Sequence, residues 1–513
     1  MSAVRPGRLS ITGALLARNW AWSLFGQAAP LAAGLVALPA IVRGVGTDRF
    51  GLLALAWSLI SAFTVFDLGL GRAVTRFVAE ALGAGRRGEI PRILWPAVAA
   101  QTGLAIGGGL ALAALAPSVV THFLRVAPEL HEEAVRTLQV VAATLPAVLV
   151  ALTLQGVLQA AQRFDILTGV RTAASASMFL APLAGVALGW DLPTMLLAVL
   201  VVRIGALAAV LVACTRVLDG LRPGRATAGP ALRDLVSFGA WASASAVVTF
   251  LLAPADRVVI GGELSMTALG HYAIPREVIS RLGVVATGSA AMVLFPAFSA
   301  LGGARDLKRL RLLFGRTAKY LALAAVPGFG LLAVFAEDLL GVWLGPGLAA
   351  ASAPSLRILA AGGALQALAA SPFVLLQGLG RADLTGRLHL AQAPVYAAAL
   401  WWMVRLRGIE GAALVWSARV ALDAVVMLEA ARRLGAWSWP DARRAVGRAV
   451  LPAAAFCAAA ALVHAAPAPA GVRVVVAVGL LLPFGWWVWA HALGPDERRT
   501  LGALLSVGRG GEP

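Results

Sequence analysis

The stretch that decides the fold spans residues 254–301 and reads PADRVVIGGELSMTALGHYAIPREVISRLGVVATGSAAMVLFPAFSAL. The part that follows Tyr272 is long and apolar enough for a membrane helix, yet it contains Arg276, Glu277 and Arg281. A charge at the centre of a bilayer costs about 2.5–3.5 kcal/mol on insertion scales. We therefore expect these three side chains to face the interior of a helix bundle or a water-filled cavity.

The composition of the whole chain indicates a polytopic membrane protein. Of its 513 residues, 60% are hydrophobic and only 13% are charged, whereas a soluble domain carries roughly 25% charged residues. A membrane-spanning helix needs ~20 apolar residues. Fourteen such segments can be traced, centred near residues 30, 59, 104, 146, 178, 204, 244, 285, 330, 364, 394, 422, 457 and 482. The expected fold class is all-α, with about fourteen transmembrane helices.

The placement of basic residues predicts the orientation of these helices. The formal net charge is +18, and most Lys and Arg residues fall in alternate connections between the expected spans. Cytoplasmic connections carry an excess of Lys and Arg, so both termini are expected in the cytoplasm. The positive charge therefore indicates topology and contact with membrane lipids, and it does not indicate nucleic-acid binding. The amphipathic stretch 306–320 is expected to be a cytoplasmic connecting helix that lies on anionic lipid.

Two pairs of similar segments indicate an internal repeat. Ile41–Gly51 and Ile260–Gly270 both run from Ile to a Gly ten residues later, and they start 219 residues apart. The tripeptides Leu154–Gly156 and Leu376–Gly378, both Leu-Gln-Gly, lie 222 residues apart. Six spans per repeat predict two lobes related by an axis normal to the membrane. We expect an N-terminal lobe at 1–221, a cytoplasmic linker at 222–232 and a C-terminal lobe at 233–433. Two extra helices and a cytoplasmic tail then occupy 434–513.

Charged residues inside the expected spans are the candidate site. The five candidate cations and three candidate acids are Arg203, Arg276, Arg281, Arg357, Arg419, Asp67, Glu277 and Asp423. Glu277 with Arg281 and Arg419 with Asp423 have the i,i+4 spacing of ion pairs, which could also hold helices together. Arg357 could instead extend its side chain to the interface. Taken together, the set is positive, and guanidinium groups bind phosphate in a bidentate manner.

The acids allow two roles, and metal binding is not expected. Asp67 and Glu277 are candidate coupling acids for a proton or sodium ion, while Glu277 and Asp423 could neutralise neighbouring arginines. The six histidines show no metal-ligand spacing, and the two cysteines, Cys214 and Cys457, lie far apart in apolar runs. We therefore expect no cofactor and no metal.

Several motifs resemble one transporter family. They are Phe66-Asp67-Leu68-Gly69-Leu70, Leu154-Gln155-Gly156, Ala255-Asp256-Arg257 and Leu294-Phe295-Pro296-Ala297. In this order and spacing the chain resembles the polysaccharide flippase (Wzx-like) branch of the MATE/MOP transporter superfamily. The resemblance implies movement of an undecaprenyl-diphosphate-linked oligosaccharide from the inner to the outer leaflet of the bacterial cytoplasmic membrane. It also implies alternating access through a cationic cavity, a monomer that works near polysaccharide polymerase machinery, and no enzymatic activity.

Three alternatives remain open at this point. A drug or cation antiporter of the same superfamily is expected to carry an acidic residue in the lumen of its first lobe. The first span, 19–41, contains none. A lipid II flippase would carry arginines in that span, which also has none. A membrane glycosyltransferase or polymerase acting on the same lipid carrier would need large external loops or paired acids at the interface.

Overall fold

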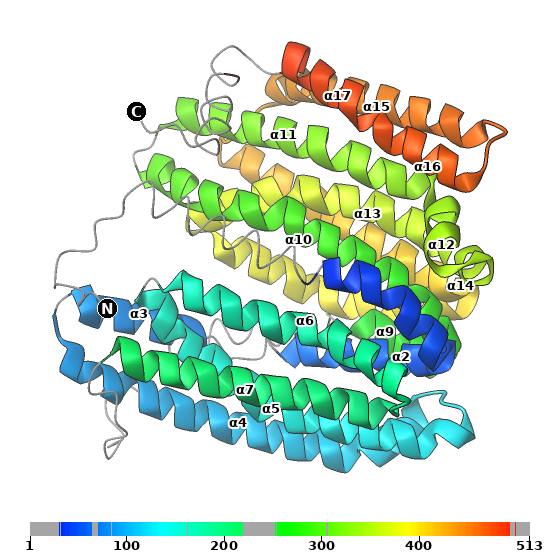
Figure 1. Ribbon diagram of the computed structural model, residues 1–513. Helices are drawn as coiled ribbons and strands as arrows, with labels where there is room; N and C mark the ends of the chain where they lie inside the picture. The colour runs from blue at the N-terminus through cyan, green and yellow to red at the C-terminus, as the bar shows by residue number, and fades with distance from the viewer. Residues whose placement is uncertain are drawn as a thin grey trace, which may run out of the picture. The chain divides into compact units, whose positions relative to one another are not determined.

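The computed structural model describes residues 30, 32–63, 70–83, 85–161, 163–218, 252, 254–303, 306–492 and 498. Every regular element in these ranges is helical (Figure 1), which confirms the expected fold class. The helices of the first half are α2 (Thr47–Phe63), α3 (Leu70–Gly83), α4 (Ile90–Ser118), α5 (His131–Ala160), α6 (Phe164–Leu188) and α7 (Leu192–Val217). Short helical turns are η1 (Arg87–Glu89), η2 (Val119–Phe123) and η3 (Pro128–Leu130).

The helices of the second half vary more in length. They are α9 (Ala255–Glu263), α10 (Met266–Gly303), α11 (Leu307–Val334), α12 (Ala336–Leu344), α13 (Pro346–Gly378) and α14 (Ala382–Arg433). The chain ends with α15 (Trp439–Ala465), α16 (Ala470–Gly479), α17 (Leu481–Trp487) and η4 (Val488–Ala492). Within α14, Gly408 has φ +58° and joins two helices without a loop. Glycine has no side chain, so it adopts a positive φ at little cost.

The expected spans can be compared with the described helices. Eight helices are long and apolar enough to cross a membrane among the described residues, and Ala32–Val45 and Leu451–Ala465 are shorter apolar helices. Every expected centre except that near residue 244 falls on a described helical residue. The centre near 244, the linker 222–232, Asp67 and the two terminal tails lie outside the described residues. One expectation was wrong, because 306–320 is not a separate surface helix: Leu307–Tyr320 forms the first half of α11.

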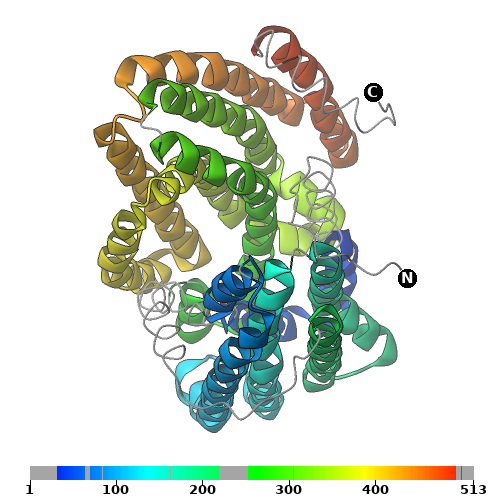
Figure 2. The ribbon, with the colours of Figure 1, turned by 90° about the vertical axis from the view of Figure 1, so that its left-hand side faces the viewer.

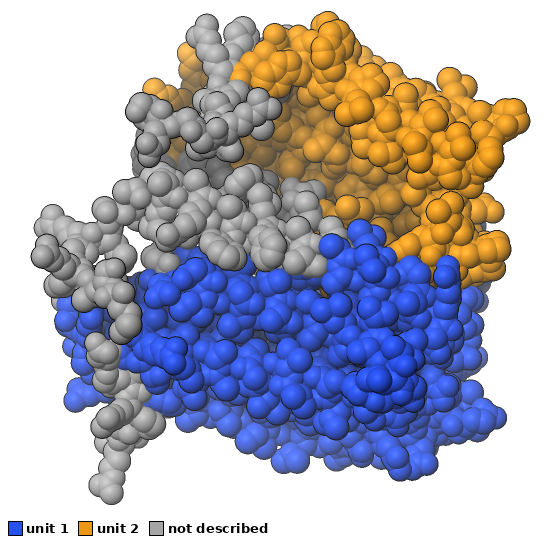
Figure 3. All heavy atoms as spheres, viewed as in Figure 1, with its two compact units in different colours: residues 1–273, 389–409 blue, residues 274–388, 410–513 orange. Residues whose placement is uncertain are grey.

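The described helices belong to two compact units (Figure 3). Unit 1 contains residues 1–273 and 389–409, and unit 2 contains 274–388 and 410–513. The unit boundaries fall inside α10 and α14, whereas the expected lobe boundary follows the repeat in the sequence. The assignment of the two lobes therefore stays a prediction.

Each unit has one central helix. In unit 1, α5 packs against α4 and α7 (Figure 1), and Leu154 and Leu158 of α5 are buried in the apolar core of that unit. In unit 2, α11 lies between α13 and α15 (Figure 2). Of the eight candidate spans, α5 and α13 are the most buried, at 72% and 61% of their apolar windows. The two Leu-Gln-Gly tripeptides lie near the ends of these helices, at 154–156 in α5 and at 376–378 in α13, so the repeat in the sequence occupies similar positions in the two helices.

Helices α2 and α10, which occupy equivalent places in the two repeats, contact each other through equivalent residues in unit 1. A Cβ atom on Gly51 would lie 2.0 Å from the carbonyl oxygen of Met266, and one on Gly270 would lie 2.7 Å from that of Thr47. Gly270 and Met266 follow Gly51 and Thr47 at the repeat offset of 219. The hydroxyl of Thr267 donates a hydrogen bond to Asp48, which is also 219 residues away. Such exchanged contacts are expected of residues related by a local two-fold axis.

A polar cluster fastens the last helices to unit 2. Asp338 of α12 is 8% exposed and accepts hydrogen bonds from Arg473 of α16 at 2.6 Å and from His464 of α15 at 2.9 Å. Arg473 also donates to the carbonyl oxygen of His464 at 2.8 Å. Because a buried carboxylate needs partners, this cluster fixes the C-terminal helix pair to α12. No spacing in the sequence predicts this cluster.

Candidate functional site

The candidate charged residues of α10 and α14 lie in unit 2, where both helices pack against α13. Two adjacent glycines of α13 allow this packing. A Cβ atom on Gly362 would lie 2.6 Å from the Trp416 ring of α14, and one on Gly363 would lie 2.6 Å from Phe329 and 3.1 Å from Ile279 of α10. A side chain at either glycine would push a neighbouring helix away. The glycine pair therefore brings α10, α11 and α14 close to one axis.

Two of the candidate arginines are bound to acids on their own helices. Arg281 donates from Nε to Glu277 Oε1 at 2.7 Å. Arg419 donates from Nη1 to Asp423 Oδ2 at 3.4 Å. Both expected i,i+4 ion pairs are thus present. The Asp423 and Glu277 side chains are 11% and 19% exposed, so each carboxylate lies largely within protein beside its arginine.

Arg276 is held differently. Its Nη1 donates to the hydroxyl of Ser280 at 2.6 Å, and this hydroxyl donates to the carbonyl oxygen of Arg276 at 2.7 Å. The guanidinium carbon lies 4.5 Å from the centre of the Trp416 ring. This contact joins α10 to α14 one helical turn from Arg281 on one side and from Arg419 on the other. The structure therefore brings Arg276, Arg281 and Arg419 onto two adjoining helices of unit 2.

Arg357 and Arg203 lie apart from this group. Arg357 of α13 pairs with Glu337 of α12 at 3.3 Å, and its side chain is 45% exposed, which agrees with the alternative that it reaches the interface. Arg203 of α7 lies in unit 1, where its Nη2 is 3.2 Å from the sulfur of Met178 in α6. Within the described residues, Arg203 Nε is buried without a hydrogen-bond partner. A thioether is a weak acceptor, so the charge of the Arg203 guanidinium is poorly compensated between α6 and α7.

The sequence had not indicated Trp416 or Ser280. Ser280 follows Arg276 by four residues, so the i,i+4 rule that found the two ion pairs would also have found it. Trp416 lies on a different helix, and no spacing connects it to Arg276. Among the described residues, no group of three or more His, Cys, Asp or Glu side chains is arranged to hold a metal ion.

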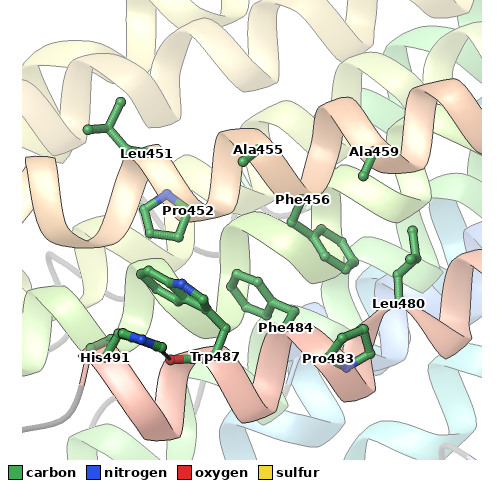
Figure 4. A pocket seen from close by; sticks show the side chains of 11 residues that line it. Leu451, Pro452, Ala455, Phe456, Ala459, Leu480, Pro483, Phe484, Trp487 and His491 are labelled. Atoms are coloured by element: carbon green, nitrogen blue, oxygen red, sulfur yellow. Dashed lines mark hydrogen bonds between the residues drawn. The ribbon is translucent and has the colours of Figure 1, made fainter.

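A separate apolar groove runs along the C-terminal helix pair (Figure 4). It has a volume of about 720 Å³ and lies between α15 and the α16–α17–η4 segment. Leu451, Pro452 and Phe456 line one side, and Phe484 and Trp487 line the other. His491 supplies the one titratable side chain in this lining. The groove therefore suits hydrocarbon and offers no arginine to an anion.

Comparisons of the sequence with known proteins find a matching family and a relative. The sequence model of a family described as "Polysaccharide biosynthesis protein" matches residues 41–351. A Shigella flexneri protein described as "Putative O-antigen transporter" is 24% identical over 411 residues, covering 80% of this chain and 96% of that protein.

Solved structures with the same fold are transporters. The lipid II flippase MurJ in an inward closed conformation has a TM-score of 0.72 and 11% identity, with 91% of this chain and 98% of that chain covered. An inward-facing multidrug resistance MATE family transporter of the MOP superfamily has a TM-score of 0.66 and 16% identity, with 80% and 94% covered. These TM-scores show a shared fold.

Proposed function

Because the chain belongs to the polysaccharide biosynthesis protein family, we propose that it flips an undecaprenyl-diphosphate-linked oligosaccharide across the bacterial cytoplasmic membrane. The direction is from the inner to the outer leaflet, and both termini are cytoplasmic. The protein acts as a transporter without chemical conversion of its substrate, and it works as a monomer close to polysaccharide polymerase machinery. The one observation that carries the proposal is the group of Arg276, Arg281 and Arg419 on α10 and α14.

These arginines suit a diphosphate for a chemical reason. A guanidinium is planar, stays charged, and matches phosphate oxygens with two parallel N–H donors. It is also more weakly hydrated than an ammonium group, so its transfer out of water is less costly. A diphosphate between α10 and α14 would meet guanidinium groups from two helices. The sugar and the isoprenoid chain then need only shape and apolar surface, which a lipid-facing bundle provides.

The paired acids explain how the empty site tolerates its charge. An arginine left alone in a bundle is strongly destabilising, whereas an arginine beside a carboxylate is compensated. Glu277 and Asp423 supply this compensation at 2.7 and 3.4 Å. When phosphate arrives, its oxygens take over the guanidinium donors and the carboxylates are released. Under this mechanism the acids neutralise the empty carrier.

Complementation of a deletion strain tests the proposal. Arg276→Ala, Arg281→Ala and Arg419→Ala should each weaken substrate binding by about 10- to 150-fold, since a hydrogen bond to a charged group contributes ~1.5–3 kcal/mol. Surface polysaccharide should fall, and the lipid-linked intermediate should accumulate, at normal protein levels. Arg407→Ala, on an exposed part of α14, is the matched control and should export normally.

Two outcomes would contradict the proposal. Normal export by all three variants would show that these arginines do not form the substrate site. Intact surface polysaccharide in the deletion strain, together with new sensitivity to cationic drugs, would instead identify an antiporter. Arg203→Ala and Arg357→Ala, tested in parallel, show whether the cationic site extends beyond the α10–α14 group.

A further inference from the structure

Trp416 is placed to control Arg276 without touching a substrate. Its side chain comes from α14 and is 2% exposed, so a ligand cannot reach the indole ring. Its face lies against the guanidinium of Arg276, 4.5 Å from ring centre to Cζ. A cation over an indole is attracted by the negative face of the ring, and Trp is the strongest of the aromatic residues in this contact. The contact therefore orients the guanidinium plane.

Ser280 fixes the remaining freedom of the same side chain. Its hydroxyl accepts from Nη1 of Arg276 at 2.6 Å and donates to the carbonyl oxygen of Arg276 at 2.7 Å. The two bonds close a ring between the end of the side chain and its own helix. An unrestrained arginine carries about 2 kcal/mol of rotamer entropy, and a ligand that binds it must supply that free energy. The Ser280 ring and the Trp416 face remove most of this cost before a ligand arrives.

Gly362 makes the indole position possible. A Cβ atom at this residue would lie 2.6 Å from Cζ3 of Trp416 and 2.4 Å from Oγ of Ser417. Since real Cβ atoms are not found so close to other atoms, any side chain here must displace Trp416. Three helices thus position the Arg276 guanidinium. Gly362 of α13 leaves space for the indole, α14 supplies the indole, and α10 supplies both Arg276 and Ser280.

We propose that Trp416 is a positioning residue that, with Ser280, preorganises the Arg276 guanidinium to bind an oxyanion such as a diphosphate. The proposal rests on the proposed function of Arg276. It adds that the affinity of the site depends on a buried indole which the substrate never contacts. A substitution of Trp416 should therefore change the binding affinity only by changing the position of the Arg276 guanidinium.

A double-mutant cycle tests this dependence. The full-length protein in detergent is titrated calorimetrically with geranylgeranyl diphosphate as the probe. Trp416→Leu should weaken binding by about 3- to 30-fold, the range of a cation–π contact, and Trp416→Phe should retain binding within about threefold. Ser280→Ala should also weaken binding. In an Arg276→Ala background, Trp416→Leu should cause no further loss.

Matched controls separate positioning from general packing. Trp402→Leu removes an exposed tryptophan of α14 and should leave binding unchanged. Gly362→Ala should weaken binding by displacing the indole, whereas Gly328→Ala, where a Cβ atom meets nothing within 4 Å, should not. If Trp416→Leu is too unstable to purify, Ser280→Ala and Trp416→Phe still complete cycles with Arg276→Ala.

The outcomes distinguish the two proposals. If Arg276→Ala binds the probe normally, the proposed site is wrong, and the positioning role is wrong with it. If Arg276→Ala binds weakly but the Trp416→Leu loss is absent, or adds fully to that of Arg276→Ala, the proposed function stands and the positioning role is overturned.

Discussion

The role of Glu277 depends on what its carboxylate does when the site is empty. It lies 2.7 Å from Arg281, and the two side chains are 19% and 34% exposed. A carboxylate in such a pair stabilises the cation beside it, and its removal leaves a charge that is largely shielded from water. The same geometry competes with a ligand, because the Arg281 donors that bind Glu277 are those that a phosphate would need.

We therefore predict opposite effects of Glu277→Gln on stability and on affinity. The variant should lose about 1–3 kcal/mol of stability, less than a fully buried pair because both side chains are partly exposed. It should bind geranylgeranyl diphosphate several-fold more tightly, since Arg281 no longer exchanges partners. Thermal unfolding in detergent and calorimetric titration measure the two effects.

Glu429→Gln provides the control for this prediction. Glu429 also pairs with arginines, Arg432 and Arg433, at the end of α14, but its side chain is 36% exposed and its partners lie outside the proposed site, so neither quantity should change. Weaker binding by Glu277→Gln, with loss of a pH dependence in transport, would identify Glu277 as a coupling acid instead.

At the residue scale, the sequence predicted contacts within a helix and missed contacts between helices. The pairs Glu277–Arg281 and Arg419–Asp423 follow from the helical repeat alone. The Trp416 contact with Arg276 depends on how α14 crosses α13, and that crossing depends on the missing side chain of Gly362. The partner of Arg203, Met178, is likewise fixed by the packing of α6 on α7. No local sequence pattern predicts how α14 crosses α13 or how α6 packs on α7.

At the element scale, the contact of α2 with α10 ties the two repeats together. Gly51 and Gly270 each meet the backbone of the opposite helix, and Asp48 binds Thr267. A transporter that exposes its site alternately to two sides must separate such contacts on one side at a time. Because the contact is small, a few kilocalories per mole of substrate-linked free energy could open it.

We predict that a crosslink across this contact stops transport. Asp48→Cys with Thr267→Cys, in a chain whose Cys214 and Cys457 are replaced by Ala, is treated with a short bifunctional thiol reagent. Export in cells, or flipping by the purified protein in liposomes, should fall to background after treatment. Each single-cysteine variant should remain active, and full activity of a completely crosslinked pair would show that the contact stays closed throughout the cycle.

The helices themselves were largely predictable, and their ends were less so. The stretch 306–320 is amphipathic. This pattern predicts which side of the helix faces water, but it does not predict where the helix ends. The stretch has no proline, and none of its residues ends the helix, so it continues into the apolar part of α11. In α14, Arg405 and Arg407 lie between the two expected spans centred near residues 394 and 422. They are helical, Arg405 pairs with Glu263 at 2.9 Å, and the turn is made by Gly408.

At the scale of the whole molecule, the remaining question is what drives the substrate outward. Five of the candidate groups, together with Glu337, form three ion pairs within unit 2, namely Arg281 with Glu277, Arg419 with Asp423 and Arg357 with Glu337. A carrier whose own charges are mostly compensated moves little net charge when it returns empty. Under the proposed function, the loaded carrier moves the charge of the diphosphate. The membrane potential contributes about 2.3 kcal/mol per elementary charge per 100 mV, and an inside-negative potential favours anion movement to the outside.

We accordingly predict that the membrane potential alone accelerates outward flipping. For a diphosphate with about two negative charges, 100 mV favours the outer leaflet by a factor on the order of 10³ at equilibrium. Liposomes that contain the protein and a fluorescent polyprenyl-diphosphate probe should expose the probe several-fold faster when valinomycin and a potassium gradient make the lumen negative. Arg276→Ala liposomes should show no such acceleration. If the rate ignores the potential and requires a proton or sodium gradient, the acids are coupling groups, because a carrier compensated by fixed carboxylates has no means of sensing those ions.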